Sequence, residues 1–118
     1  MLLKIRKIGK FYSVFDNDCY ILYYFFGYKI INHKLGFPES ALSKVVNTLL
    51  DNKISYEVIG SDDKNDFKKI NKYNYYLKLG QEKYYHDIKF VNIIDDLKNL
   101  NEEQLNKILL YIESVINE

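Results

Sequence analysis

The segment that most limits the fold is residues 18–26, DCYILYYFF, which is apolar nearly all the way round. An amphipathic surface helix keeps a polar face, so a helix without one must be buried on more than one side. We therefore expect a helix at 18–26 inside the fold. Gly27 is expected to end it in the left-handed conformation that glycine adopts readily. Side-chain oxygens of Asp16, Asn17 and Asp18 are expected to cap its start.

Alternating polar and apolar residues predict four strands around this helix. Residues 2–8 and 11–15 are expected to form two strands joined by a tight turn at Gly9-Lys10. Residues 28–33 are predicted as the third strand and residues 54–59 as the fourth.

A second helix is predicted between the third and fourth strands. Its apolar residues recur at the spacing of one helix face: Leu42, Val45, Val46, Leu49 and Leu50. Pro38 lies near its first position, where a missing N–H costs nothing. The order strand-strand-helix-strand-helix-strand predicts an α/β (α+β) fold with a mixed sheet flanked by helices.

The character of the chain changes after Gly60. Residues 66–79 are predicted as a helix stopped by Gly80, and a further helix is marked by Phe90, Ile93, Ile94 and Leu97. Asn101 and Gln104 resemble a capping box. A last apolar stripe follows them: Leu105, Ile108, Leu109, Ile112 and Ile116. We expect one domain over residues 1–118, with a core at 1–60 and a mainly helical extension at 61–118.

Charge is divided unevenly along a chain whose net charge is only +1. Residues 1–89 carry 15 basic and 10 acidic side chains, while residues 90–118 carry 2 basic and 6 acidic ones. This pattern indicates a basic body and an acidic helical tail. The alternative is that both are ordinary solvated helix faces.

No motif for catalysis is present. The sequence lacks a phosphate-binding loop, a CxxC pair and an HExxH motif, and His33 and His86 are isolated. Cys19 lies in the most apolar helix and is expected to be a core residue. We therefore expect no enzymatic activity, no metal and no cofactor. One cysteine and no apolar run of about 20 residues predict a soluble, cytoplasmic protein without a membrane segment.

One block of residues carries a family resemblance. Residues 5–19, IRKIGKFYSVFDNDC, resemble the start of the N-terminal mismatch-recognition domain of MutS-type DNA repair proteins. That domain begins with a strand, a Gly-x-Phe-Tyr turn, a second strand ending in Phe, and an acidic pair opening a helix. Residues 34–38, KLGFP, are similar to its Gly-hydrophobic-Pro element. The resemblance extends over residues 3–60.

The resemblance implies a stand-alone, non-catalytic module that binds double-stranded DNA weakly and in a salt-dependent way. Phe11 would be a wedge at the hairpin tip, of the kind that minor-groove binders insert between base steps. Ser13 stands where mismatch-reading members carry a Glu that contacts the displaced base. The implied DNA contacts are Phe11, Ser13, Lys10, Lys7, Lys34 and Gly36. From the residues alone, the alternative is that Phe11 points into the core, as Phe15 does.

A protein-interaction module is the rival interpretation. A phage- or mobile-element-type protein of this kind would regulate or inhibit a nucleic-acid-processing machine. The acidic tail favours it because acidic side chains repel DNA and suit a basic protein surface. These residues are Asp95, Asp96, Glu102, Glu103, Glu113 and Glu118. The tyrosines of 66–79 are predicted either to widen a DNA contact or to form a partner face. The expected partner through the C-terminal helices is another protein or a second copy.

Overall fold

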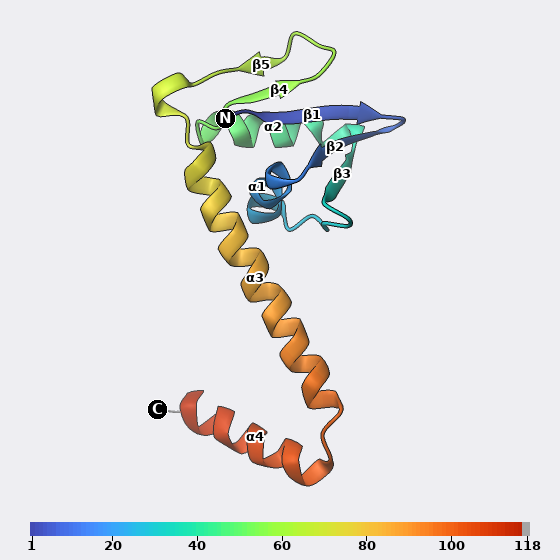
Figure 1. Ribbon diagram of the computed structural model, residues 1–118, viewed down its shortest axis with the longest axis vertical. Helices are drawn as coiled ribbons and strands as arrows, with labels where there is room; N and C mark the ends of the chain where they lie inside the picture. The colour runs from blue at the N-terminus through green and yellow to red at the C-terminus, as the bar shows by residue number, and fades with distance from the viewer. Residues whose placement is uncertain (117–118) are drawn as a thin grey trace. The chain divides into compact units, whose positions relative to one another are not determined.

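A mixed sheet forms the centre of the fold in a computed structural model that describes residues 1–116, with side chains through residue 115 (Figure 1). The strand order is β3-β2-β1-β4-β5. Strand β1 (Leu3–Ile8) pairs antiparallel with β2 (Phe11–Phe15) and parallel with β4 (Tyr56–Val58). The edges are β3 (Lys34–Pro38), antiparallel to β2, and β5 (Lys64–Asn65), antiparallel to β4. The predicted α/β class with a mixed sheet is confirmed.

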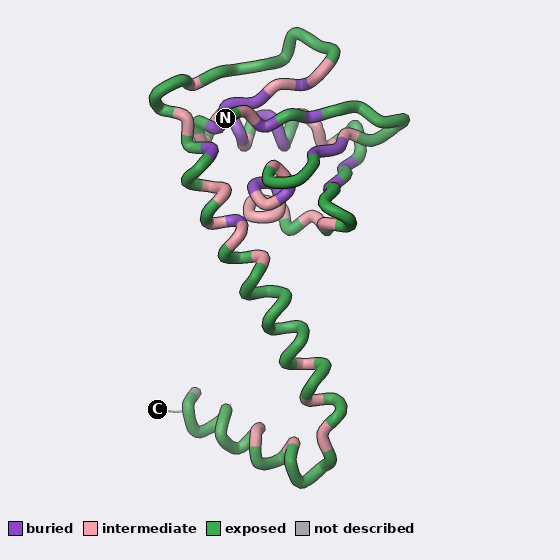
Figure 2. The backbone as a smooth tube through the Cα atoms, in the orientation of Figure 1, coloured by how far each residue is buried: buried purple, intermediate pink, exposed green. Residues whose placement is uncertain are grey.

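Helices α1 (Asn17–Phe26) and α2 (Leu42–Asp51) pack on one face of this sheet. Alternate strand residues point toward them and form the core, the purple segments of Figure 2. The strands contribute Leu3, Ile5, Val14, Leu35, Phe37, Tyr56 and Val58 to this core. The helices contribute Cys19, Ile21, Leu22, Val45, Val46 and Leu49.

Helix α1 is buried on two sides, which explains its lack of a polar face. One side meets the sheet, and the other meets the first turns of α3 (Tyr73–Lys98). The Phe25 and Tyr76 rings lie 4.9 Å apart, and the Tyr20 and Tyr84 rings 5.3 Å apart. Gly27 ends α1 with a φ of 67°, as predicted.

The predicted cap at the start of α1 is wrong. Asp16 occupies the N-cap position with a φ of 54° and makes no capping hydrogen bond through its side chain. The Asp18 carboxylate is turned away from the helix end instead. It accepts hydrogen bonds from the Lys4 backbone N–H, at 3.0 Å, and from the Tyr73 hydroxyl. Asp18 therefore ties α1 to β1 and α3.

The third strand lies later in the chain than predicted. Residues 28–33 are not a strand, because Asn32 and His33 adopt left-handed φ values of 52° and 61°. An extended strand cannot continue through such residues. The edge position is taken by β3, whose Leu35 and Phe37 alternate into the core. Pro38 ends β3 and precedes a 3-10 turn, η1 (Glu39–Ala41), before α2.

The two helices predicted at 66–79 and after Phe90 are one helix. Helix α3 begins at Tyr73, after the 3-10 turn η2 (Lys68–Ile70), and runs through Gly80 without a break. The expectation that Gly80 ends a helix is wrong. A Cβ at this position would lie 2.6 Å from the Tyr20 carbonyl carbon and closer still to its oxygen. Glycine is required here because it lets α3 approach the backbone of α1.

We expect Gly80→Ala to lower the free energy of unfolding by about 1–3 kcal/mol, the usual cost of overpacking. Alanine normally stabilises a helix interior by about 1 kcal/mol relative to glycine, so the sign of the change is diagnostic. Urea unfolding followed by circular dichroism measures it. Lys78→Ala, at an exposed position of the same helix, is the control and should be nearly neutral. A more stable G80A protein would contradict the close approach.

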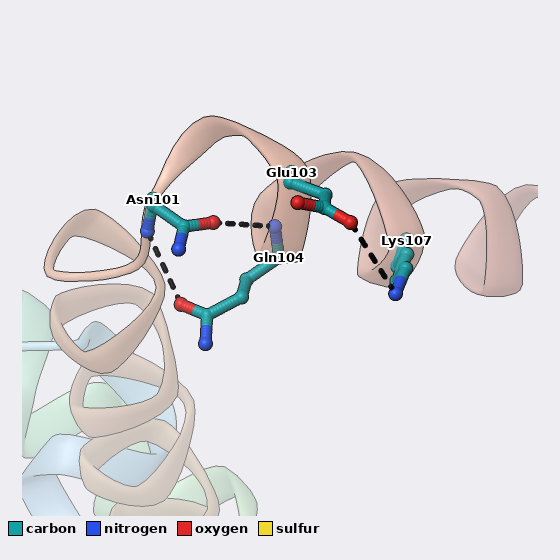
Figure 3. A network of polar contacts seen from close by, with 4 residues as sticks. All are labelled: Asn101, Glu103, Gln104 and Lys107. Carbon is teal, nitrogen blue, oxygen red and sulfur yellow. Dashed lines mark hydrogen bonds and ion pairs between the residues drawn. The ribbon is translucent and has the colours of Figure 1, made fainter.

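The chain forms two compact units, Met1–Tyr84 and Tyr85–Glu118. The second contains the end of α3 and helix α4 (Glu102–Ile116). The predicted capping box starts α4: the Gln104 N–H donates to Asn101 Oδ1 at 2.8 Å, and the Asn101 N–H donates to Gln104 Oε1 at 3.3 Å (Figure 3). The side chain of Ile116 and the whole of Glu118, both named in the sequence predictions, lie outside the described part.

Candidate nucleic-acid interface

The face of the sheet opposite α1 and α2 carries a distinct set of side chains, which we call the open face. Strand register places on it every second residue of β1, β2 and β3. Its members are Lys4, Arg6, Ile8, Phe11, Ser13, Phe15, Lys34, Gly36 and Pro38. Aromatic, aliphatic and basic side chains therefore share one surface.

Phe11 lies at the tip of the β1–β2 hairpin and is 55% exposed. The turn residues are Gly9, whose φ is 63°, and the exposed Lys10. Phe11 is paired across the sheet with Ile8 on one side and Pro38 on the other. The alternative that Phe11 points into the core is wrong, because the core side of β2 is occupied by Tyr12 and Val14.

Phe15 was expected in the core and lies on the open face instead, 36% exposed. The Lys34 ammonium lies 6.0 Å from the centroid of the Phe15 ring. This distance allows a weak cation–π attraction. Phe15 and Phe11 are four residues apart on one strand, so two aromatic rings line the same face.

Basic side chains flank these rings. Arg6 and Lys34 are exposed and lie on the strands either side of β2, with Arg6 opposite Ser13 and Lys34 opposite Phe15. Lys4 continues the row along β1. Glu57 of β4 is half-buried and is paired in register with Lys4 on one side and Lys64 on the other. Asp18 also lies close to Lys4. The open face is therefore basic as well as aromatic.

Two of the six predicted contacts, Lys7 and Ser13, are placed differently from the rest. Lys7 points to the side opposite Phe11 and binds Glu39, with 2.6 Å between ammonium and carboxylate. The hydrogen bond and charge of Glu39 raise the Lys7 pKa. Ser13 is on the open face but only 1% exposed. Gly36 is exposed, and a Cβ there would lie 3.6 Å from Ser13 Oγ, an ordinary contact.

Ser13 is covered by larger neighbours on β1 and β2, while Gly36 lies opposite it on β3. Phe11 and Phe15 flank it on its own strand, and Arg6 is opposite it on β1. A serine hydroxyl in this position is shielded from a ligand that rests on the surrounding rings. The structure thus brings together Phe11, Lys10, Lys34 and Gly36, and adds Arg6 and Phe15 to them.

Arg6 and Phe15 were missing from the predicted set although the sequence carried a signal for them. In a hairpin with a two-residue turn, Ile8 opposes Phe11 and Arg6 opposes Ser13. Counting alternate residues back from the turn places Arg6 on the same face of the sheet as Phe11 and Lys7 on the opposite face. The same count places Phe15 with Phe11.

The buried polar groups beneath the sheet have a structural role. Burial raises the pKa of the Asp18 carboxyl, while hydrogen bonds from Tyr73 and Lys4 oppose the shift. Burial, with the charges of Asp18 and Asp16, raises the pKa of the Cys19 thiol to about 12. The thiol therefore stays protonated at neutral pH, and Cys19 is the core residue that was predicted.

The described residues contain neither a candidate metal cluster nor a helix that could span a membrane. Within residues 1–116, no three or more His, Cys, Asp or Glu side chains are grouped so as to hold a metal ion. Among the helices of the same part of the chain, none combines the length and apolar character needed to cross a membrane.

Comparisons of the chain with protein-family models, with curated proteins and with solved structures found no match. The resemblance to the mismatch-recognition domain of MutS-type proteins therefore stays a prediction from the motifs at residues 5–19 and 34–38.

Proposed function

We propose that this chain is a non-catalytic DNA-binding module that presses its open face against duplex DNA and wedges Phe11 between deformable base steps. The observation that supports the proposal most is the 55% exposure of Phe11 at a hairpin tip, on the same face as Arg6 and Lys34. A phenylalanine left in water forgoes part of the roughly 1.5–3 kcal/mol that burying it yields. Insertion into a base stack recovers this energy.

The hairpin is suited to a wedge because it is held on both sides. Strand β2 lies between β1 and β3, so the backbone beside Phe11 is paired with two strands. A rigidly held ring loses little conformational entropy when it inserts between stacked base pairs. Minor-groove proteins use apolar side chains in this way and kink the duplex.

This geometry favours recognition of deformability over recognition of sequence. Unstacking a base step costs a few kcal/mol and costs least where a mispair or lesion has already weakened the stack. Because the Ser13 hydroxyl is covered by its neighbours, we assign it no contact with a base edge. The exposed cations contact phosphates, which position a protein without reading bases. In this respect the proposal departs from the mismatch-reading members of the MutS-type family.

The direct test is Phe11→Ala, with binding followed by fluorescence anisotropy on duplexes with and without one mispair at about 50 mM salt. We expect the wild type to bind the mispaired duplex more tightly. The substitution should weaken that binding about tenfold, within the about 1–3 kcal/mol that base–aromatic stacking contributes.

Phe15→Ala is the matched control, because Phe15 is a phenylalanine on the same strand and face but away from the tip. It should lose less affinity and keep the preference for the mispair. Absence of any binding by the folded wild type, or equal affinities of the wild type and F11A, would refute the wedge.

A second candidate is the protein-interaction module that regulates or inhibits a nucleic-acid-processing machine. It is favoured by residues 85–115, none of which is buried, and by the excess of acidic residues there. Affinity capture from nuclease-treated lysate separates the two candidates. A stoichiometric protein partner that survives nuclease, without DNA affinity of the chain alone, would favour this second function.

A further inference from the structure

The second compact unit exposes a large amount of apolar surface. Ten large apolar side chains between Tyr85 and Val115 are 39–70% exposed. They are Tyr85, Ile88, Phe90, Val91, Ile93, Leu109, Leu110, Tyr111, Ile112 and Val115. Helices of this length are marginal in water and depend on packing of an apolar face for their stability. This unit therefore needs a covering surface.

Helix α4 has the repeat of a helix that packs against other helices. Leu105, Ile108, Ile112 and Val115 are spaced by three, four and three residues, the a and d positions of a heptad. We call this row the α4 seam. Leu109, Leu110 and Tyr111 extend the apolar surface beyond the seam, so α4 is apolar on more than one side. A helix of that kind is covered by more than one neighbour.

The end of α3 supplies another row at helical spacing. Phe90, Ile93, Ile94 and Leu97 lie at i, i+3, i+4 and i+7. Ile94 and Leu97 are half-buried within the unit, as are Leu105 and Ile108. Phe90 and Ile93 remain 62% and 48% exposed. The end of α3 and helix α4 diverge after their short connection, so much of the apolar surface of each stays uncovered (Figure 1).

Charged residues are kept off the α4 seam. The positions that flank it within the helix include Gln104, Leu109 and Tyr111, all uncharged. Glu103 and Lys107 form an ion pair with each other at 3.7 Å, away from the seam (Figure 3). A like copy can therefore approach without bringing acidic groups face to face. A basic partner attracted by the acidic side chains would instead leave the seam uncovered.

We propose that a second copy of this chain covers the seam, so that α4 and the end of α3 from two copies pack together in a two-fold dimer. The ten exposed side chains offer on the order of 1,000 Å² per chain, against about 800 Å² per partner in a standard interface. An isologous dimer uses one self-complementary patch twice, and two helices from each copy cover α4 on two sides.

Sedimentation equilibrium of the full chain tests the proposal at loading concentrations from about 1 to about 100 µM, a range that detects micromolar dissociation constants. The expected mass is twice the 14.1 kDa of one chain. Ile112→Glu places a charge in the seam and should raise the dimer dissociation constant at least a hundredfold. Ser114→Glu adds the same charge on the exposed Glu103–Lys107 side of the same helix, opposite the seam, and should leave the dimer intact.

Near-UV circular dichroism of the tyrosine-rich first unit reports whether each variant remains folded. Val115→Ala provides a second seam variant without a new charge, and it should weaken the dimer less than I112E. A wild type that sediments as a monomer at every concentration would overturn the proposal. So would a dimer that persists in both folded seam variants, since its interface would then lie elsewhere.

Discussion

Phe37→Ala is expected to lower the free energy of unfolding by about 3–5 kcal/mol, the usual cost of truncating a buried phenylalanine. Phe37 is 1% exposed, and its ring lies between the Tyr12 and Tyr28 rings, with centroids 6.0 and 6.2 Å away. Alanine leaves a cavity that β3 and β2 cannot close without breaking their register. A domain of this size has about 5–15 kcal/mol of stability, so the loss is a large fraction of it.

Phe11→Ala is the matched control for this substitution. Phe11 and Phe37 lie on neighbouring strands, one pair apart in register, but on opposite faces of the sheet. We expect F11A to change the stability by less than about 1 kcal/mol, because exposed sites contribute little. Urea unfolding monitored by circular dichroism measures both variants. Equal losses of stability in F37A and F11A would mean that the two faces of the sheet do not differ in burial.

The second large effect concerns salt. We expect DNA binding to weaken about a hundredfold between about 50 and about 200 mM NaCl, because neutralising about four phosphates gives a slope near −3.6 in log K against log salt. The four cations counted here are Lys4, Arg6, Lys10 and Lys34. The interaction is therefore measurable only at low salt, unless two copies bind together.

Replacing Arg6 and Lys34 together by glutamine should reduce the magnitude of this slope by about 2, since each phosphate contact contributes about 1. The control is Lys7→Gln with Lys44→Gln. Lys7 is paired with Glu39, and the Lys44 ammonium lies 5.1 Å from the Phe26 ring centroid on the helical side. Equal slopes for the two double variants would show that binding follows overall charge and not the open face.

Local periodicity was enough to predict the β1–β2 hairpin and helix α2. The apolar alternation of Leu3 and Ile5 and the helical spacing of Val45, Val46 and Leu49 match the core. The third strand was misplaced because residues 28–33 and 34–38 are both rich in apolar residues. The two left-handed residues, Asn32 and His33, decide between them. No composition rule identifies such residues with certainty.

Gly80 was misinterpreted for a different reason. A glycine in a helical pattern is either a stop signal or a point of close contact, and the choice depends on Tyr20, sixty residues earlier in the chain. Long-range packing of this kind is invisible to a local pattern. The same limit applies to Ser13, whose burial depends on side chains from two strands.

The exposed position of Phe11 was predicted from the motif and not from periodicity. Alternation alone fixes which residues share a face, but it does not say which face is covered by helices. Phe11 and Phe15 share one face, and Tyr12 and Val14 share the other. Only the packing of α1 and α2 decides that the tyrosine side is the inner one.

The separation of roles between the two sides of β2 has a consequence for how such a chain changes over generations. A one-residue shift of this strand would exchange the inner and outer residues completely, so selection for folding holds its alignment fixed. Outward positions such as Phe11 and Phe15 contribute little to that selection. Substitutions at these outward positions can therefore create binding to a new ligand while the fold stays unchanged.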